Sequence, residues 1–90
     1  MERKKILIHG HVQGVFFRTY IKKLAQELNL KGVVRNLPDG KVEIIAEGEG
    51  KNIKKLIDLC NKGPKTSQVK KIDVIEEKMK NEFKNFEIIY

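Results

Sequence analysis

Residues 10–18 are the part of the chain whose side chains and spacing best support chemistry, because two glycines precede an arginine at the start of a helical pattern. Gly10 and Gly14 let the main chain turn tightly and approach a ligand. The apolar residues of this stretch carry no reactive group: Val12, Val15, Phe16 and Phe17. Such a loop acts through main-chain N–H groups, which bind anions at a helix N-terminus. The alternative is a plain strand-to-helix connection.

Arg18 favours the anion hypothesis. It falls in the expected first turn of a helix, where the positive end of the helix dipole disfavours a cation. A phosphate or carboxylate held between Arg18 and the loop N–H groups would compensate, because arginine carries a permanent charge and several donors. The alternative is an ion pair between Arg18 and a surface carboxylate.

Asn36 is a second candidate, since it stands near the end of an expected strand although asparagine is depleted in strands. Its carboxamide can both donate and accept a hydrogen bond, so it could fix a water molecule. The alternative is an ordinary asparagine at a strand end. Its neighbour Arg35 is expected to point to the opposite face of the strand.

His9 and His11 share one face of an expected strand, which raises the question of a metal site. No third ligand follows at a suitable spacing, so we expect no metal and place both residues beside the loop. The sequence also lacks a Walker loop and a Ser-His-Asp set.

Hydrophobic periodicity predicts the elements that must position these residues. Strands are expected at residues 4–12, 31–37, 41–48 and 68–77, helices at 17–29 and 52–62, and a short terminal strand in which Phe86, Ile88 and Tyr90 alternate. This order predicts an α+β, ferredoxin-like sandwich (βαββαβ plus the terminal strand), with two helices on one face of a mostly antiparallel sheet. The first and third strands are expected at the centre, with the loop after the first strand beside the second strand.

Length and composition are those of one soluble domain, residues 1–90, and we expect a monomer. A lone cysteine, no signal-peptide pattern and no membrane-span pattern lead us to expect a cytoplasmic protein without a membrane partner. The net charge of +7 raises the possibility of nucleic-acid binding. The lysines, however, are spread along the chain and line the polar side of the second helix, so we expect no nucleic-acid partner.

Two motifs in this order resemble those of the acylphosphatases. The first is GHVQGVFFR at residues 10–18, and the second is GVVRN at 32–36, followed by GKV at 40–42 and Gly48. The resemblance covers nearly the whole chain and implies hydrolysis of the carboxyl–phosphate bond of a small acyl phosphate, without a metal or organic cofactor. It implies that Arg18 is the catalytic phosphate-binding residue and that Asn36 positions the attacking water. The implied phosphate cradle is formed by the main-chain amides of Val12, Gln13, Gly14, Val15, Phe16 and Phe17.

The chain departs from the family pattern at two positions. Val33 stands where an aromatic residue is usual, and His11 stands where a basic residue is frequent. The first change bears on local packing, and the second on loop charge near neutral pH. Two other functions stay open on the sequence: an RNA-binding module of the same topology, and a regulatory domain like those at the front of hydrogenase-maturation carbamoyltransferases.

Overall fold

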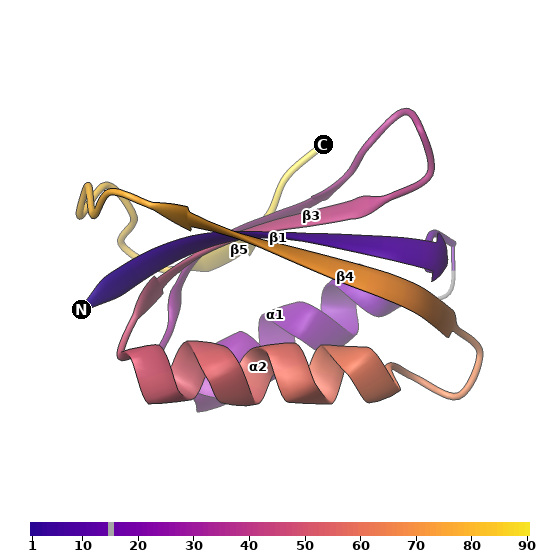
Figure 1. Ribbon diagram of the computed structural model, residues 1–90, viewed down its shortest axis with the longest axis horizontal. Helices are drawn as coiled ribbons and strands as arrows, with labels where there is room; N and C mark the ends of the chain where they lie inside the picture. Colours follow the sequence, from indigo (N-terminus) through magenta and orange to yellow (C-terminus); the bar gives the residue numbers. More distant parts are fainter. Residues whose placement is uncertain (15) are drawn as a thin grey trace.

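A computed structural model describes residues 1–14 and 16–90 of the chain. These residues form β1 (Glu2–His11), α1 (Phe17–Glu27), β2 (Lys31–Asn36), β3 (Val42–Gly48), α2 (Gly50–Lys62), β4 (Gln68–Glu77) and β5 (Phe86–Ile88). Both helices cover the same face of the sheet, and the other face carries no helix (Figure 1). The expected ferredoxin-like order and layering are therefore confirmed.

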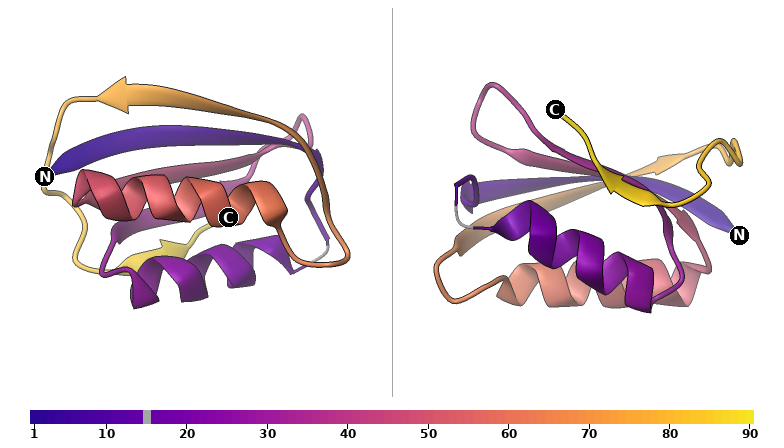
Figure 2. Two further views of the ribbon diagram at one scale, coloured as in Figure 1. Left: turned by 60° about the horizontal axis from the view of Figure 1, so that its bottom comes forward. Right: turned by 180° about the vertical axis from the view of Figure 1, so that it is seen from behind.

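The five strands are arranged in the order β4-β1-β3-β2-β5. The expected interior positions of the first and third strands are confirmed, and β1 pairs antiparallel with both β3 and β4. Only β5 runs parallel to its neighbour, β2. This pairing, continued by a hydrogen bond from the N–H of Ile89 to the main-chain oxygen of Val34, brings the C-terminal tail (yellow in Figure 2) beside β2, the strand that ends in Asn36.

All element ends lie within two residues of the predicted ones, and two of the differences have a local cause. The first helix ends at Glu27 instead of residue 29, because Asn29 adopts a positive φ of 57° that no helix can continue. The terminal strand ends at Ile88, and Tyr90 beyond it is 96% exposed instead of alternating with Phe86. The prediction for Tyr90 was wrong because the alternation of apolar residues does not show where the pairing with a neighbouring strand stops.

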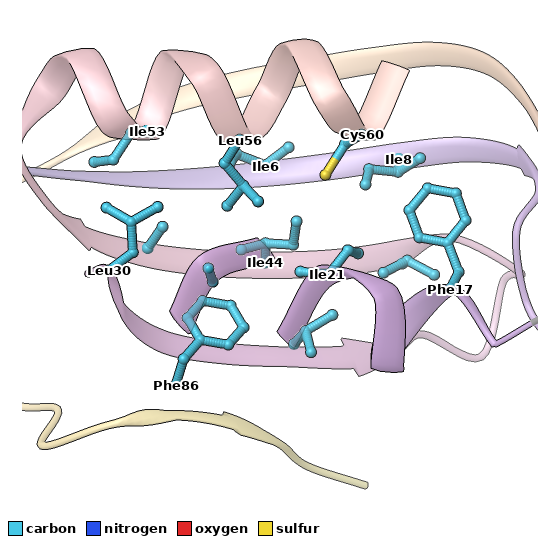
Figure 3. Close-up of a cluster of buried hydrophobic side chains, with 14 of the residues drawn as sticks. Ile6, Ile8, Phe17, Ile21, Leu30, Ile44, Ile53, Leu56, Cys60 and Phe86 are labelled. Carbon is cyan, nitrogen blue, oxygen red and sulfur yellow. The ribbon is translucent and has the colours of Figure 1, made fainter. Parts of the chain in front are cut away.

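The core lies between the helices and the inner face of the sheet (Figure 3). Both helices turn an apolar stripe toward the sheet: Phe17, Ile21 and Ala25 of α1 and Ile53, Leu56 and Cys60 of α2 are buried. Of the residues that periodicity places on these stripes, Leu24, Leu28 and Ile57 are only partly buried against the core. The sheet contributes Ile6, Ile8, Val12, Val34, Val42, Ile44, Ala46 and Phe86. Phe17 follows directly on the β1–α1 loop, so burial of its ring anchors the loop at the helix end.

Gly10 has a different role from the expected one. The β1–β4 register shifts between His9 and Gly10, and a Cβ atom at Gly10 would lie 2.1 Å from the main-chain oxygen of Gln68. Gly10, at a φ of 131°, therefore lets β4 approach β1 closely at a β-bulge. The sequence had suggested instead that Gly10 lets the main chain approach a ligand.

On the helix-free face, residues 78–85 lie against β1 and β3 through a buried ion pair. Arg3 and Glu47 are only 5% and 3% exposed, and Arg3 Nη1 lies 3.0 Å from Glu47 Oε2. The same oxygen accepts hydrogen bonds from the main-chain N–H groups of Lys80 and Asn81. No helix in the described part of the chain is both long and apolar enough to cross a membrane.

Candidate active site

A cavity of about 240 Å³ lies where β1 ends and α1 begins. It is lined by Val12, Gly14, Phe16, Phe17, Arg18, Thr19, Asn36, Ile88 and Tyr90. The loop after β1 therefore lies beside the end of β2, as expected, and the two candidate side chains, Arg18 and Asn36, face one cavity. Val15 lies outside the described residues, and Gln13 does not line the cavity.

Two described residues of the loop have a left-handed main-chain conformation. Gly14 has a φ of 72°, and Phe16, the N-cap of α1, has a φ of 60° and a ψ of 22°. A left-handed conformation costs a residue other than glycine on the order of 1–2 kcal/mol. Turns of this kind direct neighbouring N–H groups to one point, and no side chain caps the helix. Uncapped donors and local strain together favour an anion at this helix end.

Arg18 is half-buried in the first turn of α1, and that turn contains no acidic residue. No carboxylate of the described residues pairs with it, so the surface ion pair considered as an alternative is not found there. Its Cζ lies 4.9 Å from the centroid of the Tyr90 ring. The guanidinium therefore has no ion-pair partner among the described residues at the N-terminal end of α1.

Asn36 ends β2 opposite Val42 of β3. Its Oδ1 atom is buried and has no hydrogen-bond partner in the described part of the chain. A buried polar atom without a partner costs free energy and calls for a functional reason. Asn36 lines the cavity, and a carboxamide oxygen can accept a hydrogen bond from a water molecule and so fix its orientation.

Gln13 has a role that the sequence analysis missed. Its Nε2 atom donates to the main-chain oxygens of Leu37 (2.7 Å) and Lys41 (2.9 Å), which belong to the β2–β3 turn. The side chain therefore ties the loop that carries Arg18 to the strand that carries Asn36. The signal available in the sequence was a carboxamide in an otherwise apolar loop, but nothing indicated its partners.

The two histidines were expected to line or flank the loop; His11, the last residue of β1, directly precedes it, whereas His9 contacts β4 instead. His9 Nε2 lies 2.8 Å from Asp73 Oδ2 on β4, and this contact holds the pKa of Asp73 below its usual range. His11 is exposed and does not line the cavity. Among residues 1–14 and 16–90, no three side chains of metal-binding type gather at one point. Arg35 points away from the cavity, as expected, and pairs with Glu43 at 2.8 Å.

Comparisons with known proteins agree with this geometry. A family model described as "Acylphosphatase" matches residues 4–88. An acylphosphatase of Syntrophus aciditrophicus (strain SB) is 43% identical over 90 residues, which are 100% of this chain and 94% of that relative. The crystal structure of an acylphosphatase from Bacillus subtilis superposes with a TM-score of 0.96 at 34% identity, over 100% of both chains.

A larger protein contains a similar unit. The structure of full-length HypF in the phosphate- and nucleotide-bound form matches 99% of this chain with a TM-score of 0.88 at 35% identity, although the match covers only 12% of that chain. The family model and the relative of matching length, together with the fold, establish the family of this chain. The chain belongs to the acylphosphatase family, and its activity is the hydrolysis of acyl phosphates.

Proposed function

We propose that the cavity between the β1–α1 loop and the end of β2 is where the acyl phosphate is hydrolysed. Arg18 and the main-chain N–H groups of Val12, Gln13, Gly14, Val15, Phe16 and Phe17 bind the phosphate, and Asn36 positions the attacking water. The observation that carries this proposal is that two polar side chains, each with a group that lacks a polar partner among the described residues, line the same cavity. Arg18 has no carboxylate among the described residues, and the buried Oδ1 of Asn36 has no partner there.

The phosphate group is bound first. Its terminal oxygens accept hydrogen bonds from the loop N–H groups and from the guanidinium of Arg18. The loop N–H donors are fixed by the backbone and by the helix end, so they need no rearrangement when charge develops in the transition state. The buried ring of Phe17 and the side chain of Gln13 hold the loop in place around the anion.

The water is held by Asn36, on the neighbouring strand. Its Oδ1 accepts a hydrogen bond from the water and directs the water oxygen at phosphorus. The water oxygen forms a bond to phosphorus while the bond from phosphorus to the acyl oxygen breaks, and the carboxylate leaves with that electron pair. Positioning and charge stabilisation supply most of the rate in such a transfer.

The proton of the water goes to a phosphate oxygen of the substrate. Neither a carboxamide nor an arginine can act as a base at neutral pH. A carboxylate is a good leaving group, so no strong acid is required. Arg18 and the loop supply the positive charge that a metal would otherwise contribute, and we propose that the reaction needs no metal or other cofactor.

Two substitutions test the assignments, with benzoyl phosphate as substrate and EDTA present. Arg18→Ala is expected to lower kcat/KM by at least about 10²–10³-fold, the cost of losing one such donor, and to weaken inhibition by inorganic phosphate. Asn36→Ala is expected to abolish turnover but to leave that inhibition nearly unchanged. Arg35→Ala is the matched control, because the same residue type is removed from the opposite face, and its activity should equal that of the wild type.

Near-native turnover of Asn36→Ala would exclude the water-positioning role. Equal losses of kcat/KM in Arg18→Ala and Arg35→Ala would show that the net positive charge of the protein, and not a contact between Arg18 and the phosphate, explains the effect. A rate that disappears with EDTA and returns with a divalent cation would refute the metal-free reaction.

We also propose that residues 1–90 act as one domain, as a cytoplasmic monomer whose partner is a small molecule. One core cluster joins both helices to the sheet, which supports a single folding unit. RNA-binding modules of this topology expose aromatic side chains on their central strands for base stacking, whereas β1 and β3 contain no Phe, Tyr or Trp. Sedimentation tests the monomer, and titration with single-stranded RNA at two salt concentrations tests the absence of nucleic-acid binding.

A further inference from the structure

Phe16 carries an aromatic ring that neither helix capping nor core packing explains. It is the N-cap of α1, and its left-handed main chain, with a φ of 60°, suits glycine or asparagine better than a bulky residue. Its side chain makes no cap hydrogen bond, and the residue is 83% exposed. The ring of Phe17, by contrast, points into the core (Figure 3). The ring of Phe16 therefore needs a reason outside the fold.

The position of this ring relates it to the substrate. Of the Phe and Tyr residues in the described part of the chain, only Phe16 and Tyr90 are largely exposed, and both line the cavity that contains Arg18 and Asn36. An acyl phosphate has a charged half and an acyl half. The polar groups of the cavity bind the phosphate and the water, so the acyl group is the part of the substrate left for an apolar surface.

We infer that the ring of Phe16 binds the acyl group and makes the site favour aromatic over small acyl phosphates. This inference rests on the proposed function of the cavity and names the substrate class within it. The N–H group of the same residue belongs to the proposed phosphate cradle, so the ring adjoins the bound phosphate. A flat aromatic acyl group can stack on the ring, and both then lose apolar surface to water. An acetyl group is too small to cover the ring and gains little.

The quantity to measure is the ratio of kcat/KM for benzoyl phosphate to kcat/KM for acetyl phosphate. The two substrates share the phosphate group, so a disturbance of the loop changes both rates and cancels in the ratio. Phe16→Ala removes the ring but keeps the Cβ atom, and with it the main-chain restriction of a residue other than glycine. We expect the ratio to fall about two- to tenfold, the factor that corresponds to one aromatic contact.

A binding measurement separates the ring from the chemical step. Phenylphosphonate and methylphosphonate carry a carbon–phosphorus bond in place of the bond that is hydrolysed, and they differ in the group that would meet the ring. In Phe16→Ala, the inhibition constant of phenylphosphonate relative to that of methylphosphonate should rise by a similar factor. The reason is that contact with the ring is made on binding and is kept in the transition state.

Two further variants of the full chain serve as controls. Phe16→Tyr keeps the aromatic face, and both ratios should equal those of the wild type. Ile75→Ala removes an exposed apolar side chain from β4 that does not line the cavity, and its ratios should not change either. Melting temperatures verify that each variant is folded at the assay temperature.

Unchanged ratios in Phe16→Ala would overturn the inference, and a parallel fall of both rates would show that residue 16 acts through its main chain alone. Equal changes in Phe16→Ala and Phe16→Tyr, or a similar change in Ile75→Ala, would also contradict a stacking contact at this ring. Each of these results leaves the role of Arg18 intact. Full activity of Arg18→Ala toward both substrates would instead overturn the proposed function itself.

Discussion

At the scale of single residues, several local rules are broken at one end of the molecule. Phe16 is left-handed, α1 begins without a side-chain cap and Arg18 stands at the wrong end of the helix dipole. The buried Oδ1 of Asn36 lacks a partner in the described residues. Departures of this kind gather where function requires them, because the rest of the structure must hold them in place.

Gln13 is one of the residues that hold the site together. Gln13→Ala removes both hydrogen bonds to the β2–β3 turn, so we expect the free energy of unfolding to fall by about 1–2 kcal/mol. The loss in kcat/KM should be larger than stability explains, about 10–100-fold, because a small displacement of a positioning loop is costly. Urea unfolding and turnover of benzoyl phosphate measure the two effects.

Gln26→Ala is the control, since it removes an exposed side chain of the same type from α1. Its stability and turnover should match those of the wild type. If Gln13→Ala behaved like Gln26→Ala, the link between loop and turn would have no role in catalysis.

At the scale of elements, the bulge in β1 sets where the loop begins. Gly10→Ala would bring a Cβ atom against the main chain of β4, so we expect a loss of several kcal/mol in unfolding free energy, beyond the ~1 kcal/mol cost of the φ angle alone. Gly40→Ala provides the comparison, because its φ is also positive at 97° but nothing lies within 4 Å of the added atom. Chemical denaturation of both variants separates the steric clash with β4 from the cost of the positive φ. Similar losses of unfolding free energy in the two variants would show that β4 leaves room for a side chain at residue 10.

The Arg3–Glu47 pair controls how residues 78–85 lie on β1 and β3. Burial alone would raise the pKa of Glu47, but the hydrogen bonds from Arg3 and from the N–H groups of Lys80 and Asn81 hold that pKa below its usual range. Its contribution to stability is therefore complete above the unfolded-state pKa, about 4.3 for glutamate, and is lost as the pH falls through the lower pKa of the folded state.

We expect the unfolding free energy of the wild type to decrease as the pH is lowered below about 4.3, and to depend less on pH in Glu47→Gln. The variant should also be less stable at pH 7, because the buried Arg3 loses one of its three charged partners and keeps only Glu77 and Glu82. Urea titrations from pH 3 to pH 7 make the comparison. Parallel pH profiles for the two proteins would show that other carboxylates are responsible.

At the scale of the whole molecule, one core closes both helices onto the sheet and includes a thiol. Cys60 is fully buried, and burial raises the pKa of its thiol to about 12. We expect no reaction with a thiol reagent such as DTNB at pH 8 while the protein is folded, and complete reaction in denaturant, because the reactive thiolate is absent and the sulfur is inaccessible. Fast labelling of the native protein would contradict this packing.

The sequence by itself determined the order of the elements, the apolar side of both helices and the family, and it led to the proposed pair Arg18 and Asn36. Those features depend on residues close together in the chain, whose periodicity and motifs are visible in one dimension. The tertiary structure alone decided the bonds of Gln13, the close approach at Gly10 and the ring of Tyr90 beside Arg18. It also paired His9 with Asp73 and Arg3 with Glu47. Each joins segments distant in sequence, and only strand register and the path of the tail determine which side chains meet.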